Sequence, residues 1–198
     1  MEGVSFLRRV FAVFLLLAAG IALLIVGLLW GGRGGEGGES VELVFVVPPG
    51  FGWVLELNRS FRVDVEGLGL GDYAKIDFTC DGVGRVPLIS WENVSGAKAY
   101  TVIVYDPDAP IGIFYHLIVY NVRGTSLSKA MGEGLPNSGG LPGWYPICPP
   151  KGSKPHRYYF LVIAQSERIP PVESVEELAE TLKKYAIAYG WSMIVYKR

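Results

Sequence analysis

The sequence is poor in the residues that build most metal and disulfide sites, with two cysteines and two histidines among 198 residues. It also lacks a charge excess: 18 basic against 19 acidic residues leave no electrostatic footprint for nucleic acid, so we expect no nucleic-acid partner. Cys80 and Cys148 are too few for a disulfide scaffold and lack metal-type spacing. One bridge between them stays open if the domain lies outside the cell.

Charge is also missing from residues 10–30, a continuous apolar run. At about 1.5 Å per residue this run crosses the roughly 30 Å hydrocarbon core of a bilayer as one helix. Arg8 and Arg9 precede it and only Arg33 follows closely, which predicts a cytoplasmic N-terminus at residues 1–9 and a domain outside the cell membrane. A cleaved signal peptide is the alternative, although its apolar region is usually only about 7–15 residues long.

Residues 31–40 read GGRGGEGGES and are predicted to be a flexible linker to a domain at residues 41–198. In the domain, β-branched and aromatic runs predict strands at residues 41–47, 61–65, 74–79, 100–105, 117–121, 158–163 and 191–196. The helix pattern that we find in the domain spans residues 175–189, with Ser174 as N-cap and Gly190 as its stop. Many strands and one late helix indicate a mainly β sandwich.

Chemistry-bearing residues gather between residues 106 and 158. Asp106 and Asp108 follow a predicted buried strand, His116 begins the next strand, and His156 and Tyr158 begin a third. If these strand ends meet at one edge of a sheet, two carboxylates, two imidazoles and a phenol share one pocket. The alternative is that each histidine is bonded to nearby backbone and that the aspartates only shape turns.

Several ordered motifs make this chain resemble the phosphatidylethanolamine-binding protein family, which includes the Raf kinase inhibitor proteins and bacterial and archaeal relatives. The resemblance covers about 135 residues and rests on the order of its motifs, since each is weak alone. These motifs are residues 78–82, 87–91, 106–110, His116 with Asn121, 148–152 leading into 156–158, and the ending 194–198.

The resemblance implies an antiparallel β-sandwich with a C-terminal helix and a small pocket for phosphate-type anions or phospholipid headgroups. Carried over by motif, the ligand-binding residues are Asp106, His116, His156 and Tyr158, with Asp108 and Pro110 shaping the loop. Arg157 is expected to be an ion-pair partner and not a ligand residue. The resemblance implies no metal, no cofactor and no catalytic residue. Cys80 and Cys148 both belong to family motifs, where we favour buried free thiols over a bridge.

Two departures from the family pattern affect the pocket rim. Pro146 and Ile147 replace the usual glycine-proline pair, which makes the rim more apolar. The apolar residues 111–115 narrow the mouth or offer an apolar lip to lipid. Trp91 lines the pocket or packs in the core.

We therefore predict a membrane-tethered binding module that regulates a partner protein. The alternatives are an inhibitor of a surface-exposed protease or other enzyme, and a hydrolase that uses the same pocket with a histidine as general base. If protonated histidines donate to the anion, binding should tighten below about pH 6.5.

Overall fold

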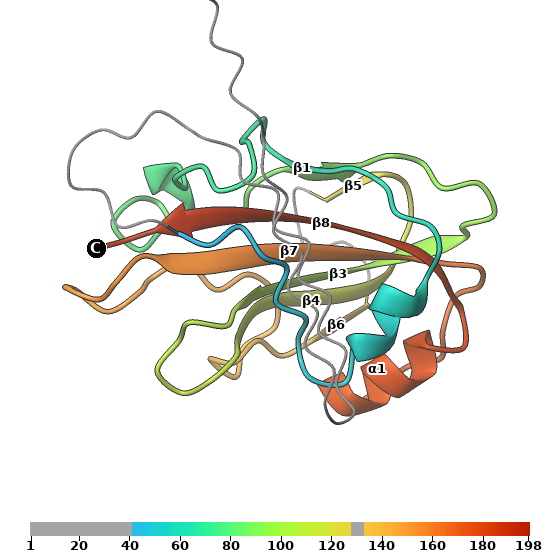
Figure 1. Cartoon of the computed structure of the whole chain (residues 1–198). Helices are drawn as coiled ribbons and strands as arrows, with labels where there is room; N and C mark the ends of the chain where they lie inside the picture. The colour runs from blue at the N-terminus through green and yellow to red at the C-terminus, as the bar shows by residue number, and fades with distance from the viewer. Residues whose placement is uncertain (1–40, 128–132) are drawn as a thin grey trace, which may run out of the picture. The chain divides into compact units, whose positions relative to one another are not determined.

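A computed structural model describes residues 41–127 and 133–198. Its larger sheet is antiparallel and has five strands, in the order β6 (Glu133–Leu135), β4 (Phe114–Val122), β3 (Ala99–Asp106), β7 (His156–Gln165) and β8 (Ala186–Tyr196) (Figure 1). A smaller sheet contains β1 (Val63–Val65), β2 (Ile89–Trp91) and β5 (Ser126–Leu127). The described residues also form one α-helix, α1 (Val175–Leu182), and two 3-10 helices, η1 (Gly52–Glu56) and η2 (Ile76–Phe78).

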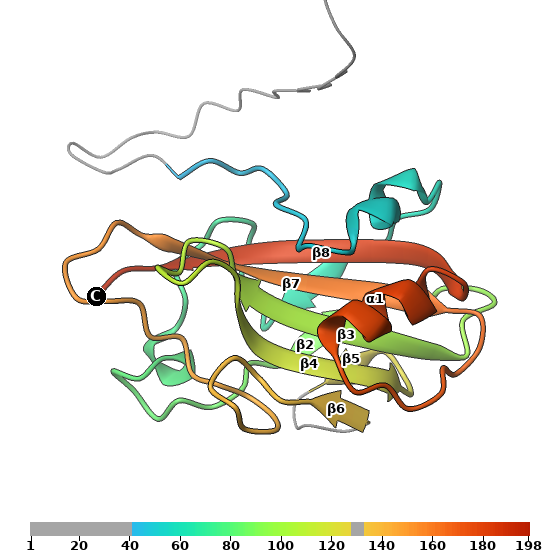
Figure 2. The ribbon, with the colours of Figure 1, turned by 90° about the horizontal axis from the view of Figure 1, so that it is seen from below.

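The larger sheet is covered on both faces, so β3 is buried along its whole length. Val104 and its neighbours on one face pack against Ile89 and Leu127 of the smaller sheet. On the other face Ile103 and Tyr105 belong to a second core with residues of α1 and η1 (Figure 2). This confirms the mainly β sandwich, and it places the ends of β3 and β7 on a support with apolar packing on both sides.

The predicted helix begins where expected but ends early. Glu177 N–H donates to Ser174 Oγ at 3.1 Å, which confirms the N-cap. The helix stops at Leu182, and residues 186–189 belong to β8, where they pair with β7. Gly190 is therefore a strand residue, and a Cβ there would lie 2.3 Å from the carbonyl oxygen of Phe61. It is required for a close backbone approach and does not end the helix.

Two predicted strands are wrong. Residues 74–79 contain the short helix η2 in place of a strand. Residues 41–47 form no strand, although Phe45 stacks on Trp191 with ring centroids 4.7 Å apart. Their backbone is instead held by tyrosines of the sheet, because the Tyr105 hydroxyl donates to the Val46 carbonyl at 2.6 Å and the Tyr159 hydroxyl donates to the Val44 carbonyl. Side-chain donors here replace the ladder that the apolar pattern suggested.

The interpretation of Cys80 and Cys148 as buried free thiols is also wrong. They form a disulfide whose Cα atoms are 5.4 Å apart, and Cys80 is exposed. The backbone has already brought the two cysteines together, because Cys80 N–H donates to the Ile147 carbonyl and Ile147 N–H donates to Phe78.

The predicted membrane helix at residues 10–30 and the linker lie outside the described residues. Within residues 41–127 and 133–198, no helix is long and apolar enough to span a bilayer. Residues Glu39–Arg198 form one compact unit.

Candidate functional site

The antiparallel pairing of β3 with β4 and β7 brings three strand ends together. Asp106, the last residue of β3, pairs with Phe114 at the start of β4, and Tyr105 pairs with Tyr159 near the start of β7. A pocket of about 220 Å³ opens at this end of the sheet. Its lining includes five of the six predicted site residues: Asp106, Pro110, His116, His156 and Tyr158.

Asp106 and His156 form a buried pair in this pocket. His156 Nδ1 lies 2.7 Å from Asp106 Oδ2, while Asp106 Oδ1 accepts the backbone N–H of Asp108 at 2.8 Å. Burial raises the pKa of Asp106, and the hydrogen bond to His156 opposes that rise. The carboxylate fixes the tautomer of the histidine with the proton on Nδ1, so Nε2 is the nitrogen left for a ligand.

His116 is held differently, by backbone. Its Nδ1 donates to the carbonyl of Tyr145 at 2.8 Å, and its ring meets Tyr158 edge-on with centroids 5.3 Å apart. Burial lowers the pKa of His116 to about 4. This lowered pKa argues against a protonated His116 as the source of tighter binding below about pH 6.5, because the ring is neutral at physiological pH and presents Nε2 as an acceptor.

Tyr158 contributes a hydroxyl group with no protein partner. The side chain is fully buried on the side of β7 that faces the pocket, and among the described residues its Oη makes no hydrogen bond. Burial raises the pKa of Tyr158, so the group remains a neutral donor. A buried hydroxyl without a partner costs free energy, so a ligand atom that accepts its hydrogen bond would be stabilised there.

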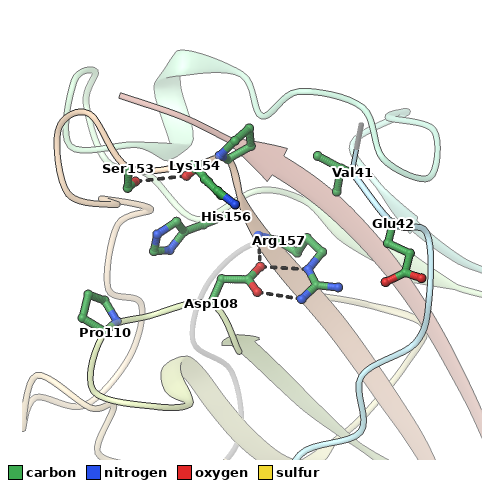
Figure 3. A pocket seen from close by; sticks show the side chains of 9 residues that line it. Val41, Glu42, Asp108, Pro110, Ser153, Lys154, His156 and Arg157 are labelled. Carbon is green, nitrogen blue, oxygen red and sulfur yellow. Dashed lines mark hydrogen bonds and ion pairs between the residues drawn. The ribbon is translucent and has the colours of Figure 1, made fainter. Parts of the chain in front are cut away.

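Asp108 lies outside the pocket and has a structural partner. Its carboxylate accepts hydrogen bonds from Arg157 Nε at 2.8 Å and from Arg157 Nη2 at 2.6 Å. It also accepts one from the backbone N–H of Arg157 (Figure 3). Burial alone would raise the pKa of Asp108, but these hydrogen bonds outweigh it and hold the pKa below its usual range. The predicted ion-pair role of Arg157 is confirmed, and Asp108 fixes the loop after β3 against β7.

Asp108 and Arg157 instead line a wider groove of about 740 Å³ beside the pocket. The groove shares Pro110 and His156 with the pocket, and Val41 and Glu42 form its opposite wall (Figure 3). The first described residues of the chain thus lie next to the candidate site.

One wall of the pocket consists of Cys148, Pro149 and Pro150. The disulfide ties this wall to Cys80, and Arg198 Nη1 lies 3.4 Å from Cys148 Sγ while its guanidinium pairs with Asp81. No residue of the pocket lining is a serine or threonine, and its one cysteine is in the disulfide.

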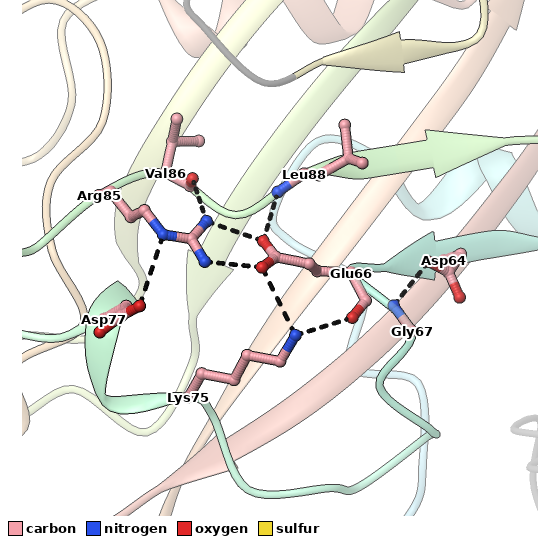
Figure 4. Close-up of polar contacts among 8 residues, drawn as sticks. All are labelled: Asp64, Glu66, Gly67, Lys75, Asp77, Arg85, Val86 and Leu88. Carbon is pink, nitrogen blue, oxygen red and sulfur yellow. Dashed lines mark hydrogen bonds and ion pairs between the residues drawn. The ribbon is translucent and has the colours of Figure 1, made fainter.

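A polar network joins the turn after β1 to residues 85–88, which follow Cys80 in the chain (Figure 4). Glu66 accepts both Nη atoms of Arg85, at 2.8 and 2.6 Å, and the backbone N–H of Leu88 at 3.0 Å. The hydrogen bonds from Arg85 lower the pKa of Glu66 to about 2. Glu66 has a positive φ of 51°, so its side chain compensates for an unfavourable backbone conformation.

The apolar lining agrees with the apolar mouth expected from residues 111–115, although none of its side chains except Pro110 was among the predicted site residues. Ile111, Phe114 and Tyr145 line the pocket with Ala109 and the Cys148–Pro150 wall. Their only signal was the apolar character of residues 111–115 and of the rim. Trp91 does not line the pocket: it is buried in the core, with its ring 5.3 Å from Tyr100, which decides between the two interpretations. No group of three potential metal ligands occurs in the described part of the chain.

The fold and this pocket define a class of β-sandwich proteins with a small cavity, lined by a few polar side chains among apolar ones, at the end of a five-stranded sheet. The sequence model described as "Phosphatidylethanolamine-binding protein" matches residues 69–197, more than half of the chain. The chain belongs to the phosphatidylethanolamine-binding protein family.

Comparisons with individual proteins support this family assignment. A "UPF0098 protein" of Aquifex aeolicus is 34% identical over 137 residues, covering 61% of this chain and 79% of that protein. "Putative lipoprotein LppC" of Mycobacterium tuberculosis is 30% identical over 183 residues, covering 86% of this chain and 90% of that protein. The crystal structure of a family homolog from Chlamydia trachomatis matches with a TM-score of 0.66 and 28% identity, covering 71% of this chain and 99% of that one. Escherichia coli YbcL matches with a TM-score of 0.62 and 29% identity, covering 70% and 98%.

Proposed function

We propose that this protein is a membrane-tethered module that binds phosphate-type groups, including phospholipid headgroups, in the pocket of Asp106, His116, His156 and Tyr158. The observation that carries the proposal is the hydroxyl of Tyr158, a residue of the pocket lining, which is buried and has no hydrogen-bond partner among the described residues. An oxygen of a phosphate group satisfies this donor.

The charge balance of the pocket favours a ligand that brings its own protons or a cation. No lysine or arginine lines it, His116 is neutral, and Asp106 is a carboxyl group. A bare phosphate dianion would be repelled by an ionised Asp106. A phosphate monoanion or a zwitterionic headgroup matches better, because its hydroxyl or ammonium donates to Asp106 or to the free Nε2 atoms.

A membrane location is supported by the sequence and by one relative. The relative that aligns with 86% of this chain is named "Putative lipoprotein LppC". The first cysteine of this chain is Cys80, so the apolar residues 10–30 serve as the anchor in our proposal. The disulfide agrees with an oxidising compartment outside the cytoplasm.

A hydrolase receives less support. The Asp106–His156 pair has the geometry of an oriented general base, but the lining offers no serine, threonine or free thiol for it to activate.

The test is a titration of the full chain in phospholipid nanodiscs with inorganic phosphate and O-phosphoethanolamine, followed by the imidazole resonances of the two histidines. Both should shift and saturate. Tyr158→Phe should weaken binding by about 3- to 10-fold, the value of one neutral hydrogen bond.

This variant separates binding from folding. Removing an unpartnered buried hydroxyl should leave the protein at least as stable as the wild type. Tyr120→Phe is the matched control, because Tyr120 Oη accepts from Val172 in the other core, and its affinity should be unchanged. No shift at millimolar ligand, or equal affinities of wild type and Tyr158→Phe, would refute the proposal.

A further inference from the structure

We propose that the mouth of the pocket docks on the bilayer, with Ile111 inserting among the lipids as an apolar lip, so that the ligand is the headgroup of a lipid in the same membrane. This inference rests on the tether and the pocket proposed above, and it adds the surface and the source of the ligand.

Ile111 is the central observation. It lies in the loop between β3 and β4 and lines the pocket, yet 76% of its surface is exposed. Tyr145, another lining residue, is 37% exposed. An isoleucine with this exposure at the rim of the pocket contributes little to folding, because it buries little area. Apolar and aromatic side chains in this position suit the interface between headgroups and acyl chains.

The course of the chain directs this rim toward a membrane. Val41 and Glu42 line the groove that shares Pro110 and His156 with the pocket (Figure 3). In Figures 1 and 2 the described chain begins at the end of the sheet where β7 starts, whereas α1 lies toward the other end. The ten residues 31–40 span at most about 36 Å, and as a flexible coil about 16–19 Å. The proposed anchor at residues 10–30 would therefore limit how far Val41, the first described residue, can lie from the bilayer.

The charges around the mouth suit an anionic lipid surface. Lys151 and Lys154 are exposed in the loop that enters β7, and Lys154 lines the groove. The acidic Asp108 beside them is neutralised by Arg157, which leaves Glu42 as the opposing charge of this groove. Basic residues near a membrane are attracted to anionic headgroups. The tether raises the local concentration of lipid, so an inserted side chain does not have to supply the whole affinity for the membrane.

The experiment uses the full chain in nanodiscs of phosphatidylethanolamine and phosphatidylglycerol, with a small fraction of lipid that carries a nitroxide on its headgroup. Isoleucine and leucine methyl groups are labelled, and paramagnetic broadening is compared at Ile111 and Leu55. Leu55 is the control, because it is 59% exposed but belongs to η1, next to α1. The broadening should be clearly stronger at Ile111.

Two variants then distinguish membrane insertion of Ile111 from the closeness to the membrane that a tether gives every part of the domain. Ile111→Ser should lower the docked population by about tenfold, which reduces the broadening of the His116 and His156 imidazole signals. Leu55→Ser should leave that broadening unchanged. Equal broadening at Ile111 and Leu55, or no effect of Ile111→Ser, overturns the docking surface. If the Ile111 signal is lost as the protein concentration rises in lipid-free detergent, the docking surface is overturned too, since a second copy of the protein then covers the lip.

A phosphate titration of the same samples distinguishes this failure from failure of the proposed function. Imidazole shifts without preferential broadening at Ile111 overturn the docking and leave the binding function standing. Preferential broadening without phosphate shifts supports the docking surface and refutes the phosphate pocket.

Discussion

His116 should make the folded protein less stable in mild acid. Burial lowers its pKa from 6.5 to about 4, so between these pH values the unfolded chain binds a proton that the folded protein does not. Stability must then fall as the pH falls through this window. At about 1.4 kcal/mol for each pH unit, the full effect is roughly 3 kcal/mol.

The substitution that isolates this effect is His116→Asn. An asparagine amide can keep the donor to the Tyr145 carbonyl, which His116 Nδ1 contacts at 2.8 Å, but it does not titrate. Urea unfolding of both proteins between pH 7 and pH 4.5 measures the difference. Because Glu66, Asp81 and Asp108 have pKa values below their usual range, their loss of stability falls mainly at lower pH and is common to both proteins.

The wild type should lose more stability than His116→Asn over this range, by about 2 to 3 kcal/mol. The histidine spectrum gives an independent check, because the chain has only two histidines. The His116 signal should keep the tautomer with the proton on Nδ1 and titrate near pH 4. Parallel stability curves, or a His116 midpoint near 6.5, would refute the reasoning.

Three further predictions concern stability. Replacing Cys80 and Cys148 by serine should lower the free energy of unfolding by about 4 kcal/mol, because the disulfide closes a loop with a sequence separation of 68 residues. Calorimetry of the oxidised, reduced and mutant proteins tests this. Equal melting temperatures of all three proteins would contradict it. Gly190→Ala should cost about 2 kcal/mol or more because of the Phe61 carbonyl, whereas Gly52→Ala, whose Cβ meets nothing within 4 Å, should change stability by less than about 0.5 kcal/mol. Asn121→Ala should cost about 3 kcal/mol, because its amide pairs with both the N–H and the carbonyl of Ile169 at 2.9 Å; urea unfolding with an unchanged midpoint would show that water replaces both bonds.

The sequence predicted the central strands and the convergence of the polar residues because both depend on local patterns. Continuous β-branched and aromatic runs mark β3, β4 and β7, and antiparallel pairing of consecutive strands leaves Asp106 and His116 at the same end. The predictions failed where contacts between residues far apart in the sequence determine the local structure. Residues 186–189 join β8 because β7 provides a partner, and residues 41–47 are held by tyrosine hydroxyl groups.

The charge states of the two pocket histidines could not be predicted from the sequence either. Whether a histidine is charged depends on burial and on which nitrogen meets a carbonyl, and neither follows from the spacing of His116 and His156. The disulfide depended on a contact between residues 78–80 and Ile147, which are remote in sequence.

The attachment of residues 41–47 also has a mechanical consequence. Tyr105 and Tyr159, whose hydroxyl groups hold this segment, belong to β3 and β7, which are neighbours inside the sheet, and their rings stack 5.4 Å apart. A pulling force on residue 41 therefore enters the sheet at two interior strands and not at an edge strand that could peel away. Tyr158, the residue before Tyr159 on β7, lines the pocket. Such a force would therefore act on the residue beside one that lines the proposed ligand site.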